Sequence, residues 1–335
     1  MRTRLLFAVV FPCLAVIAAV PQAQEACSGE ITERVLQVMK TNGPYSETLG
    51  LYLKEVGGPV LAACNERKVF EPASTIKVLH HLHAMLQVQQ KVVSLEDSIT
   101  VYSAYAGSCP LDRGPFTEPL RTTLEGVMRQ SDNARTQALR VRFGEANINA
   151  TAQALGMKDT LLQHRLGCSG RGDQRVPGDY GALDKPNRLT LVDAGLLYES
   201  VAQGKVLDSE HRQIFYEIML GKVGSLTPWG FLRQIITQEI PVGMTQEKVT
   251  AFMESIEIRY KAGSYTFCTG FLCTNHQSVA GWARVPFCEG AEIRPREYVL
   301  GDFFSEAVGN ASIMTSITYA KLLREQVRAA LRSCA

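Results

Sequence analysis

The chain has 335 residues and a formal net charge of +2, with 35 Lys and Arg against 33 Asp and Glu. Its length provides for one large domain or two, with a core of ample size. A charge balance so close to zero gives no case for nucleic-acid binding.

The N-terminus has the order of residues that is typical of a secretory signal peptide. Arg2 and Arg4 precede an apolar run that ends at Val20, and small or polar residues follow as far as Ala26. An uncleaved anchor is the alternative, but the run is short for a stable membrane span. We therefore expect residues 1–26 to be removed, the protein to be secreted or periplasmic, and the mature chain to have no stable membrane span.

Along the mature chain, the apolar residues predict strands near both ends and helices between them. Residues 29–40 have helical spacing, two apolar runs within 48–69 predict a hairpin of strands, and 74–235 look mostly helical. The predicted strands after this helical part are Tyr260–Phe267, Ser278–Val285 and Tyr298–Phe304, and a helix with an apolar stripe from Ile313 to Leu331 follows. This order is typical of an α/β layer with an all-α insertion. Residues 221–258 are extra length to which no function is assigned.

Cysteine usage agrees with export. Loss of the leader also removes Cys13 and leaves an even number of cysteines, which in an exported chain indicates disulfides. No pair has C-x-x-C spacing and no His adjoins a cysteine pair, which disfavours a zinc site. The eight remaining cysteines are Cys27, Cys64, Cys109, Cys168, Cys268, Cys273, Cys288 and Cys334.

Ser74-Thr75-Ile76-Lys77 carries the strongest chemical signal. On a helix, positions i and i+3 share a face, so the lysine amine can reach the serine hydroxyl. Serine is a weak nucleophile until an adjacent base takes its proton, and a desolvated lysine can act as that base. Taken alone, the motif could equally be a helix cap followed by a surface lysine.

Two further motifs follow in order: Ser131-Asp132-Asn133 and Lys261-Ala262-Gly263-Ser264. The set S-x-x-K, S-D-N and K-x-G resembles the signature of class A β-lactamases and penicillin-binding proteins. The stretch 120–133, Ala154-Leu155-Gly156-Met157 and the segment from Lys261 to Trp282 also resemble this family, so the likeness covers roughly residues 28–333.

The resemblance implies an α/β fold of the β-lactamase/transpeptidase type for residues 27–335. We expect an antiparallel five-stranded sheet flanked by helices, built from 27–73 and 259–335, with a mainly helical subdomain at 74–235. The terminal helices would pack together on one sheet face, so we expect a Cys27–Cys334 disulfide. The active site would lie between the two subdomains.

The resemblance also assigns roles to residues. Ser74 would be the nucleophile, Lys77 would take or relay its proton, Ser131 would pass a proton to the leaving nitrogen, and Lys261 would supply positive charge. Asn133, Gly263 and Ser264 would bind substrate, with the backbone N–H groups of Ser74 and Ser264 forming the oxyanion hole. Asp132 would be a structural residue of its turn.

Two positions depart from the family pattern. Ala262 stands where the family usually has a hydroxyl for the substrate carboxylate, and Ser264, of the same strand parity, could compensate. Class A enzymes also carry E-x-x-L-N in the Ω-loop, whose glutamate activates water, yet no glutamate occurs between Glu145 and Glu199. Counting along the chain places Leu166 or Ser169 at that position, and the nearby carboxylates that could substitute are Asp173, Asp179 and Asp184.

We therefore expect a monomeric serine acyl-enzyme hydrolase that β-lactams acylate and that deacylates slowly, with no cofactor and no metal. His80, His81 and His83 could be interpreted as metal ligands, but we expect them to have packing or surface roles instead. The alternatives are a penicillin-binding D-alanyl-D-alanine carboxypeptidase and, from another class, a non-catalytic ligand-binding module on the same fold.

Overall fold

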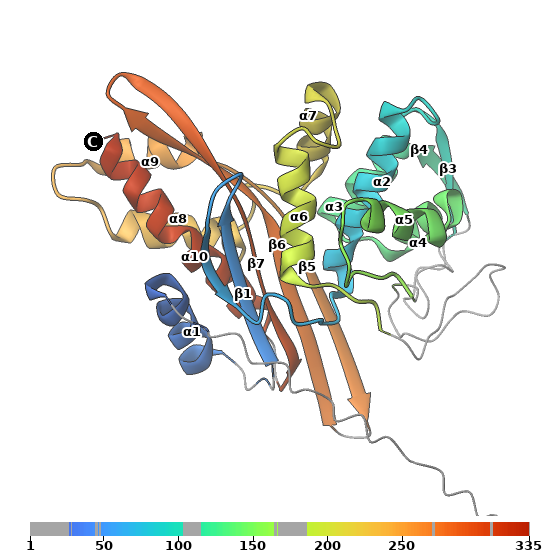
Figure 1. The fold of residues 1–335 in the computed structure, drawn as a ribbon, viewed down its shortest axis with the longest axis horizontal. Coiled ribbons are helices and arrows are strands. Elements are labelled where there is room, and N and C mark those ends of the chain that lie inside the picture. The colour runs from blue at the N-terminus through green and yellow to red at the C-terminus, as the bar shows by residue number, and fades with distance from the viewer. Residues whose placement is uncertain are drawn as a thin grey trace, which may run out of the picture.

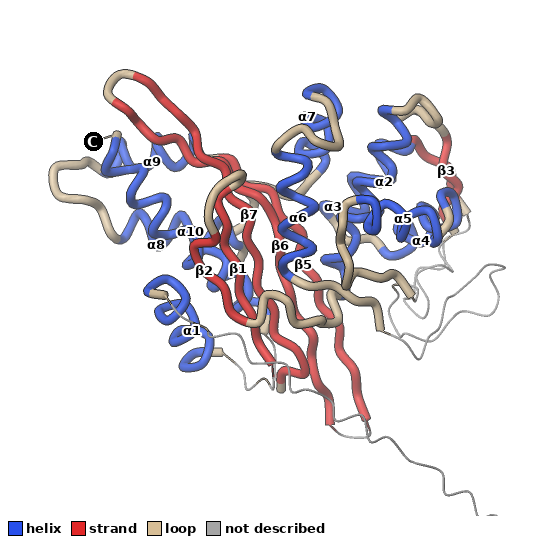
Figure 2. The backbone as a smooth tube through the Cα atoms, in the orientation of Figure 1, coloured by secondary structure: helices blue, strands red, loops and turns tan. Residues whose placement is uncertain are grey.

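The computed structural model describes residues 27, 29–43, 46, 48–102, 115–163, 166, 186–269, 272–308 and 311–334. The predicted signal peptide therefore lies outside the described residues. Figures 1 and 2 show a central sheet with helices on both of its faces. The mixed α/β architecture predicted from the motifs is confirmed.

The sheet has five antiparallel strands in the order β2-β1-β7-β6-β5. Its strands are β1 Thr48–Glu55, β2 Val60–Cys64, β5 Glu257–Thr269, β6 Leu272–Glu289 and β7 Glu292–Ala307. The hairpin predicted within 48–69 is thus β1 and β2. Because β5 is an edge strand, one row of its backbone groups is left without a strand partner in the sheet.

Helices occupy most of the remaining described chain. In chain order they are α1 Glu30–Asn42, the 3₁₀ helix η1 Ala73–Ile76, α2 Lys77–Gln89, α3 Leu120–Arg129, α4 Asn133–Phe143, α5 Glu145–Ala154, α6 Leu191–Ala202, α7 Ser209–Ile218, α8 Pro228–Gln238, α9 Gln246–Ser255 and α10 Ser312–Ser333. A small two-stranded sheet, β3 Ser98–Val101 with β4 Phe116–Pro119, lies within the helical part.

Two apolar cores lie on opposite faces of the sheet. One joins the face that carries Val299 and Phe303 to α2–α7, and the other joins the face of Leu300 and Phe304 to α1, α8, α9 and α10. This alternation along β7 follows from the period of two of a strand. The terminal helices share one face, as the resemblance implied.

The three late strands extend beyond their predicted ranges at both ends. The prediction rested on apolar side chains, which indicate a strand only where at least one sheet face is covered. At the start of β7, residues 292–296 are exposed, and their pairing with β6 comes from backbone hydrogen bonds. The pairing of β6 with β7 therefore continues into residues whose side chains give no apolar pattern from which a strand could be predicted.

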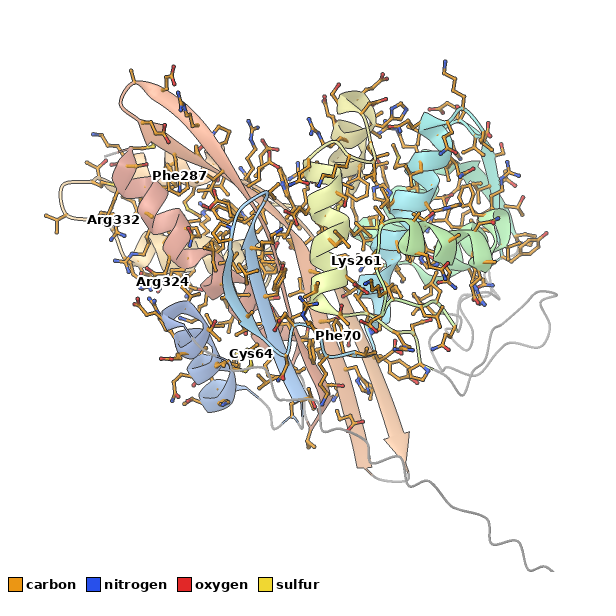
Figure 3. All side chains as sticks on the ribbon, viewed as in Figure 1. Cys64, Phe70, Lys261, Phe287, Arg324 and Arg332 are labelled. Atoms are coloured by element: carbon orange, nitrogen blue, oxygen red, sulfur yellow. A yellow bond between two sulfur atoms is a disulfide. The ribbon has the colours of Figure 1, made fainter. Side chains whose placement is uncertain are left out.

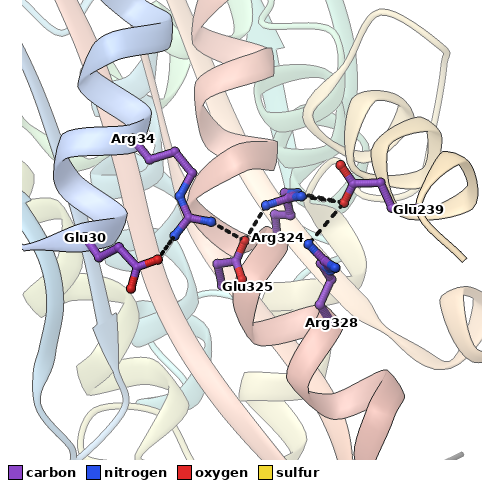
Figure 4. A network of polar contacts seen from close by, with 6 residues as sticks. All are labelled: Glu30, Arg34, Glu239, Arg324, Glu325 and Arg328. Atoms are coloured by element: carbon purple, nitrogen blue, oxygen red, sulfur yellow. Dashed lines mark hydrogen bonds and ion pairs between the residues drawn. The ribbon is translucent and has the colours of Figure 1, made fainter. Parts of the chain in front are cut away.

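Residues 221–258, which the sequence left without a role, form α8 and α9. The buried Trp229, Leu232 and Ile236 of α8 join the same core as α10. Arg324 of α10 donates to Glu239 just after α8 at 2.6 and 2.9 Å, and Arg34 of α1 pairs with Glu325 at 2.7 Å. Figure 4 shows this network, which consists of Glu30, Arg34, Glu239, Arg324, Glu325 and Arg328. The segment thus closes the outer face of the terminal-helix layer.

The predicted Cys27–Cys334 disulfide is wrong. Cys27 is bonded to Cys64 and Cys334 to Cys288, with Cα separations of 4.5 and 5.0 Å. Through the strand register, Cys64 is level with Asp302 of β7, whereas Cys288 faces Ile293. At ~3.3 Å per residue, these levels are about 30 Å apart along the strand. The terminal helices share a face, but their cysteines attach to opposite ends of the sheet.

The remaining cysteines are described only in part. Cys268 and Cys273 occupy facing positions of β5 and β6, while Cys109 and Cys168 lie outside the described residues. Within the described ranges, no helix combines the length and the apolar character that a bilayer span requires.

The Cys288–Cys334 bond provides a test of this arrangement. The bond joins cysteines that are 46 positions apart in the sequence. Because it closes this loop, loss of the bond should lower the free energy of unfolding by about 2–4 kcal/mol. Cys288→Ala, Cys334→Ala and the double variant should all lose the same amount in urea unfolding. Losses that add in the double variant would show that the two cysteines are not partners.

Candidate active site

Ser74 is the one point of access in an otherwise buried stretch. Every residue from Phe70 to Met85 is buried except Ser74, which is partly exposed. It lies in η1, and Lys77 begins α2 directly after it. In a 3₁₀ turn the side chains at i and i+3 are eclipsed, so this geometry aligns Ser74 with Lys77 more closely than the α-helix expected from the sequence.

The turn that carries Ser74 is anchored on the sheet by neutral hydrogen bonds. Thr75 Oγ1 lies 2.8 Å from Ser278 Oγ, and the Ser278 hydroxyl donates to the Pro72 carbonyl at 3.0 Å. Ala73, which precedes the serine, has a φ of +48°, a left-handed conformation that is strained for a residue with a Cβ. The contacts on both sides of Ser74 therefore fix its backbone.

Gly263 is the position on β5 that permits this approach. A Cβ built there would lie 2.3 Å from the Pro72 carbonyl oxygen and 2.8 Å from the Ser74 nitrogen. Only glycine lets the strand backbone come this close to the turn. The K-x-G motif thus has a steric reason at its third position.

Lys77 is fully buried, and its amine is surrounded by neutral oxygens. Nζ donates to the Ser131 carbonyl and to Asn133 Oδ1, each at 2.6 Å, and lies 3.3 Å from Ser131 Oγ. Burial lowers the pKa of Lys77 well below its ordinary value; the charge of Lys261 lowers it further and Asp132 opposes this. A neutral amine at this place can accept a proton.

Lys261 enters the same cluster from β5, and Figure 3 labels it. Its Nζ donates to Ser131 Oγ at 2.9 Å and to the Ala262 carbonyl at 2.6 Å. Burial lowers the pKa of Lys261 to about 7. Ser131 therefore touches both amines, and a proton can pass along this set of groups.

The S-D-N turn is held by an ion-pair cluster behind it. Ser131 has a φ of +58°. Asp132 caps α4 by accepting from the Arg135 N–H at 2.9 Å, and it pairs with the Arg135 guanidinium at 2.8 Å. Arg135 also donates two hydrogen bonds to Glu118, at 2.7 and 2.9 Å. Asp132 is thus hydrogen-bonded to Arg135, and this contact fixes the turn that presents Ser131 and Asn133.

The edge strand β5 borders the site. Ala262 and Ser264 are exposed, whereas Lys261 and Gly263, which alternate with them, are buried. Ala262 and Ser264 therefore lie on the same side of the strand, as expected. Ser264 Oγ accepts a hydrogen bond from Gln277 Nε2 at 2.7 Å. Of the two positions that counting assigns to the missing Ω-loop glutamate, Leu166 packs against the helical core and Ser169 lies outside the described residues. The carboxylates that could substitute, Asp173, Asp179 and Asp184, also lie outside the described residues.

The three histidines of α2 are packing residues. His81 Nε2 lies 3.0 Å from the Phe215 carbonyl oxygen and its ring stacks on Phe215, while His83 Nδ1 lies 2.8 Å from Thr151 Oγ1. Burial lowers the pKa of His80 to about 3 and that of His81 to about 4. Among the described residues no group of three or more His, Cys, Asp or Glu could hold a metal.

The family model described as "Beta-lactamase enzyme family" matches residues 29–228, which include Ser74, Lys77 and the S-D-N turn. The chain belongs to the β-lactamase enzyme family. No match was found among curated protein sequences.

Solved structures show the same fold at low identity. PBP-A is 17% identical with a TM-score of 0.62, and the match covers 89% of this chain and 96% of PBP-A. A β-lactamase from Sphaerobacter thermophilus is 19% identical with a TM-score of 0.62, covering 90% and 95%. A class A β-lactamase representative from Bacteroides cellulosilyticus is 16% identical with a TM-score of 0.64, covering 89% and 97%.

In this member of the β-lactamase family, several residues that shape the site were missed by sequence reasoning. Thr75 and Ser278 anchor the turn of Ser74, Arg135 and Glu118 hold the S-D-N turn, and Glu71 contacts the backbone beside Ser74. Ser278 faces Gly263 only through the strand register, which the sequence does not reveal. The Arg135–Glu118 pair spans separate elements and had no signal in the sequence.

Gly263→Ala tests the close approach of β5 to the nucleophile turn. The added methyl must displace the turn, so we expect a loss of about 1–3 kcal/mol in unfolding free energy. Acylation by a fluorescent penicillin should fall on the order of 10²-fold, because small displacements of a nucleophile are costly.

Gly290→Ala is the matched control, since a Cβ there meets nothing within 4 Å. Its φ of +66° makes some loss of stability expected, but acylation should be unchanged. A Gly263→Ala variant that labels at the parent rate would contradict the steric account.

Proposed function

We propose that this protein is a serine acyl-enzyme hydrolase that β-lactams acylate, that hydrolyses their amide bond, and that deacylates slowly. The observation that carries the proposal is the environment of Ser74. Ser74 is the one partly exposed residue of a buried stretch and lies one eclipsed turn before Lys77, whose pKa burial lowers. The proposed base also lies 3.3 Å from Ser131 Oγ, so nucleophile, base and relay residue are close to one another.

The proposed acylation proceeds in two proton-coupled steps. Ser74 Oγ attacks the carbonyl carbon of the amide and its proton passes to neutral Lys77, while the carbonyl oxygen becomes an oxyanion. The backbone N–H groups of Ser74 and Ser264 donate to that oxyanion. The C–N bond then breaks, and Ser131 donates its proton to the leaving nitrogen and is reprotonated from Lys77. The hydrogen bonds that join Ser131 to both lysine amines support this relay.

Recognition of the substrate carboxylate is assigned to Lys261 and Ser264. A bound carboxylate stabilises the ammonium form and would raise the pKa of Lys261 from about 7. Ala262 has no hydroxyl to contribute. The Ser264 hydroxyl accepts from Gln277, which leaves its own hydrogen free to donate to the carboxylate. Asn133 would hold the substrate amide through its side-chain N–H groups, since its oxygen already accepts from Lys77.

Slow deacylation follows from the lack of a glutamate between Glu145 and Glu199. Loss of a positioned general base lowers a rate typically on the order of 10²–10⁴-fold. Leu166, one of the two positions at which the base was sought, packs in the helical core and offers no acceptor. The acyl-enzyme should therefore form faster than it is hydrolysed, and it should accumulate.

A D-alanyl-D-alanine carboxypeptidase is the second candidate, and the same lack of a base favours it. A small D-alanyl leaving group departs after acylation and no longer blocks the approach of water. A mutant of PBP-A, a neighbour in fold, is known as an acyl-enzyme complex with penicillin G. A non-catalytic binding module is less consistent with the joint presence of Ser74, Lys77, Ser131 and Lys261. We further propose that the protein is a monomer and that it is secreted or periplasmic, a location that the two described disulfides favour.

Ser74→Ala should abolish covalent labelling and leave the fold intact. The methyl group removes the nucleophile while η1 keeps its contacts through Thr75. Intact-mass measurement after incubation with penicillin should show an adduct in the parent and none in the variant. An adduct of unchanged yield in the variant would move the nucleophile elsewhere.

Lys77→Ala should slow acylation on the order of 10²–10⁴-fold, because the proton acceptor is lost. Stopped-flow acylation rates at several penicillin concentrations separate this loss from weaker binding, which should change little. Lys91→Ala, at an exposed position beyond α2, is the control. A rate within a few-fold of the parent would remove Lys77 from the mechanism.

With a chromogenic cephalosporin, product should appear as a burst of one equivalent followed by slow turnover. The burst reports acylation by Ser74, and the slow phase reports hydrolysis of the ester without a glutamate base. Mass spectrometry during the slow phase should show the adduct. Fast linear hydrolysis with no adduct would make the protein an efficient β-lactamase instead.

A further inference from the structure

Glu71 is a buried carboxyl group that none of the proposed steps uses. It lies three residues before Ser74, is 8% exposed, and is enclosed in the stretch from Phe70 to Met85. A carboxyl group is rarely buried unless it is paired or hydrogen-bonded. Its position beside the nucleophile therefore calls for a role.

Glu71 lies close to two backbone segments that are far apart in the sequence. Its Oε1 accepts a hydrogen bond from the N–H of Ala73 at 3.0 Å. The backbone N–H of Asn187 lies close enough to lower the pKa of Glu71, while Glu71 Oε2 is buried without a hydrogen-bond partner among the described residues. One carboxyl group thus binds the left-handed residue next to Ser74 and lies near the segment that enters α6.

The segment around Asn187 is tied to the same region by further contacts. Phe70 and Leu189 exchange backbone hydrogen bonds at 3.0 and 3.2 Å, and Phe70, labelled in Figure 3, stacks on Phe303 of the sheet. Asn187 Oδ1 accepts a hydrogen bond of 2.8 Å from the backbone N–H of Gln163. In the sequence, residues 164–185 separate Gln163 from this segment. Asn187 therefore lies near Glu71 through its backbone and is hydrogen-bonded to Gln163 through its side chain.

We propose that Glu71 is a positioning residue for the acylation step, which holds the backbone beside Ser74 in register with the segment that enters α6. As a carboxylate it accepts the Ala73 N–H with full charge and attracts the Asn187 N–H, and the bond to Ala73 holds that residue in its left-handed conformation. As a neutral acid or an amide it interacts with both N–H groups more weakly, and the turn is held less firmly. The inference rests on the proposed acylation of Ser74.

The charge of Glu71 depends on pH in the neutral range. Burial raises the pKa of Glu71 to about 7, and the two N–H groups oppose this. The ionisable group of β5 that senses its charge is Tyr265, against which His276 of β6 lies with ring centroids 6.1 Å apart. Burial raises the pKa of Tyr265 and lowers the pKa of His276, so the neutral form of each side chain is favoured. Neither side chain therefore supplies a charge that could replace that of Glu71.

The sign of the expected pH effect follows directly. As pH rises through about 7, Glu71 becomes a carboxylate, the turn tightens, and acylation should accelerate. Deprotonation of Lys261 acts in the opposite direction because the substrate carboxylate loses its partner. Glu71 thus contributes to the rising limb of the pH profile and Lys261 to the falling limb.

The test compares the parent with Glu71→Gln, which has the same shape but no ionisable group. The acylation rate with penicillin, measured from pH 5.5 to 9 by stopped flow, should lose the part of its rising limb near pH 7. Above pH 7.5 it should be roughly tenfold below the parent. Glu96→Gln, at an exposed position, is the matched control and should keep the parent profile. A Glu71→Gln profile that matches the parent in shape and height overturns the proposal.

A second readout needs no catalysis and separates failure of this proposal from failure of the proposed function. Hydrogen exchange followed by mass spectrometry should show that peptides covering 70–76 and 186–190 gain protection between pH 6 and 8, after correction for intrinsic rates. Glu71→Gln should lack that gain, and Glu96→Gln should show it. If the parent is not acylated but shows the gain, Glu71 anchors the turn and the acyl-transfer function falls. If the gain is absent from the parent, the positioning role falls.

Discussion

Two lysine amines are buried within reach of one serine hydroxyl, and the hydrogen bonds of both go to neutral oxygens. Lys77 binds Ser131 and Asn133, and Lys261 binds Ser131 and the Ala262 carbonyl. Burying two ammonium groups without a carboxylate in contact disfavours their charged forms, and each charge disfavours the other. The fold therefore maintains one amine as a proton acceptor at neutral pH. The nucleophile, the proton relay and carboxylate recognition in the account above all depend on this constraint.

Such a cluster requires a rigid frame, which the two cores and the edge strand provide. The turn that carries Ser74 is held against β5 and β6 by Thr75, Ser278 and the missing Cβ of Gly263. The S-D-N turn is held by the ion pairs of Arg135 with Asp132 and Glu118. Left-handed backbone at Ala73 and Ser131 shows that both turns are fixed in strained conformations by their surroundings.

The sequence was sufficient to predict the fold class and to name residues of the site, because Ser74, Lys77, Ser131 and Lys261 stand in three motifs whose ordered set resembles the signature of one family. It could not indicate the disulfide partners, since the distance between strand ends depends on register. The same holds for Glu71, whose neighbours Ala73 and Asn187 offer backbone N–H groups that leave no trace in residue type. A single sequence therefore does not reveal hydrogen bonds to backbone groups or contacts between elements that are distant along the chain.

The protonation of Lys77 tests this account most directly. In protein labelled with ¹³C at the lysine Cε, each resonance can be titrated from pH 5 to 11, and the Lys77→Arg variant identifies the signal of Lys77. The account predicts that this signal titrates well below the value near 10.4 of exposed lysines, and that Lys261→Met raises its pKa because one repelling charge is gone. A Lys77 signal that titrates with the exposed lysines would contradict the central claim.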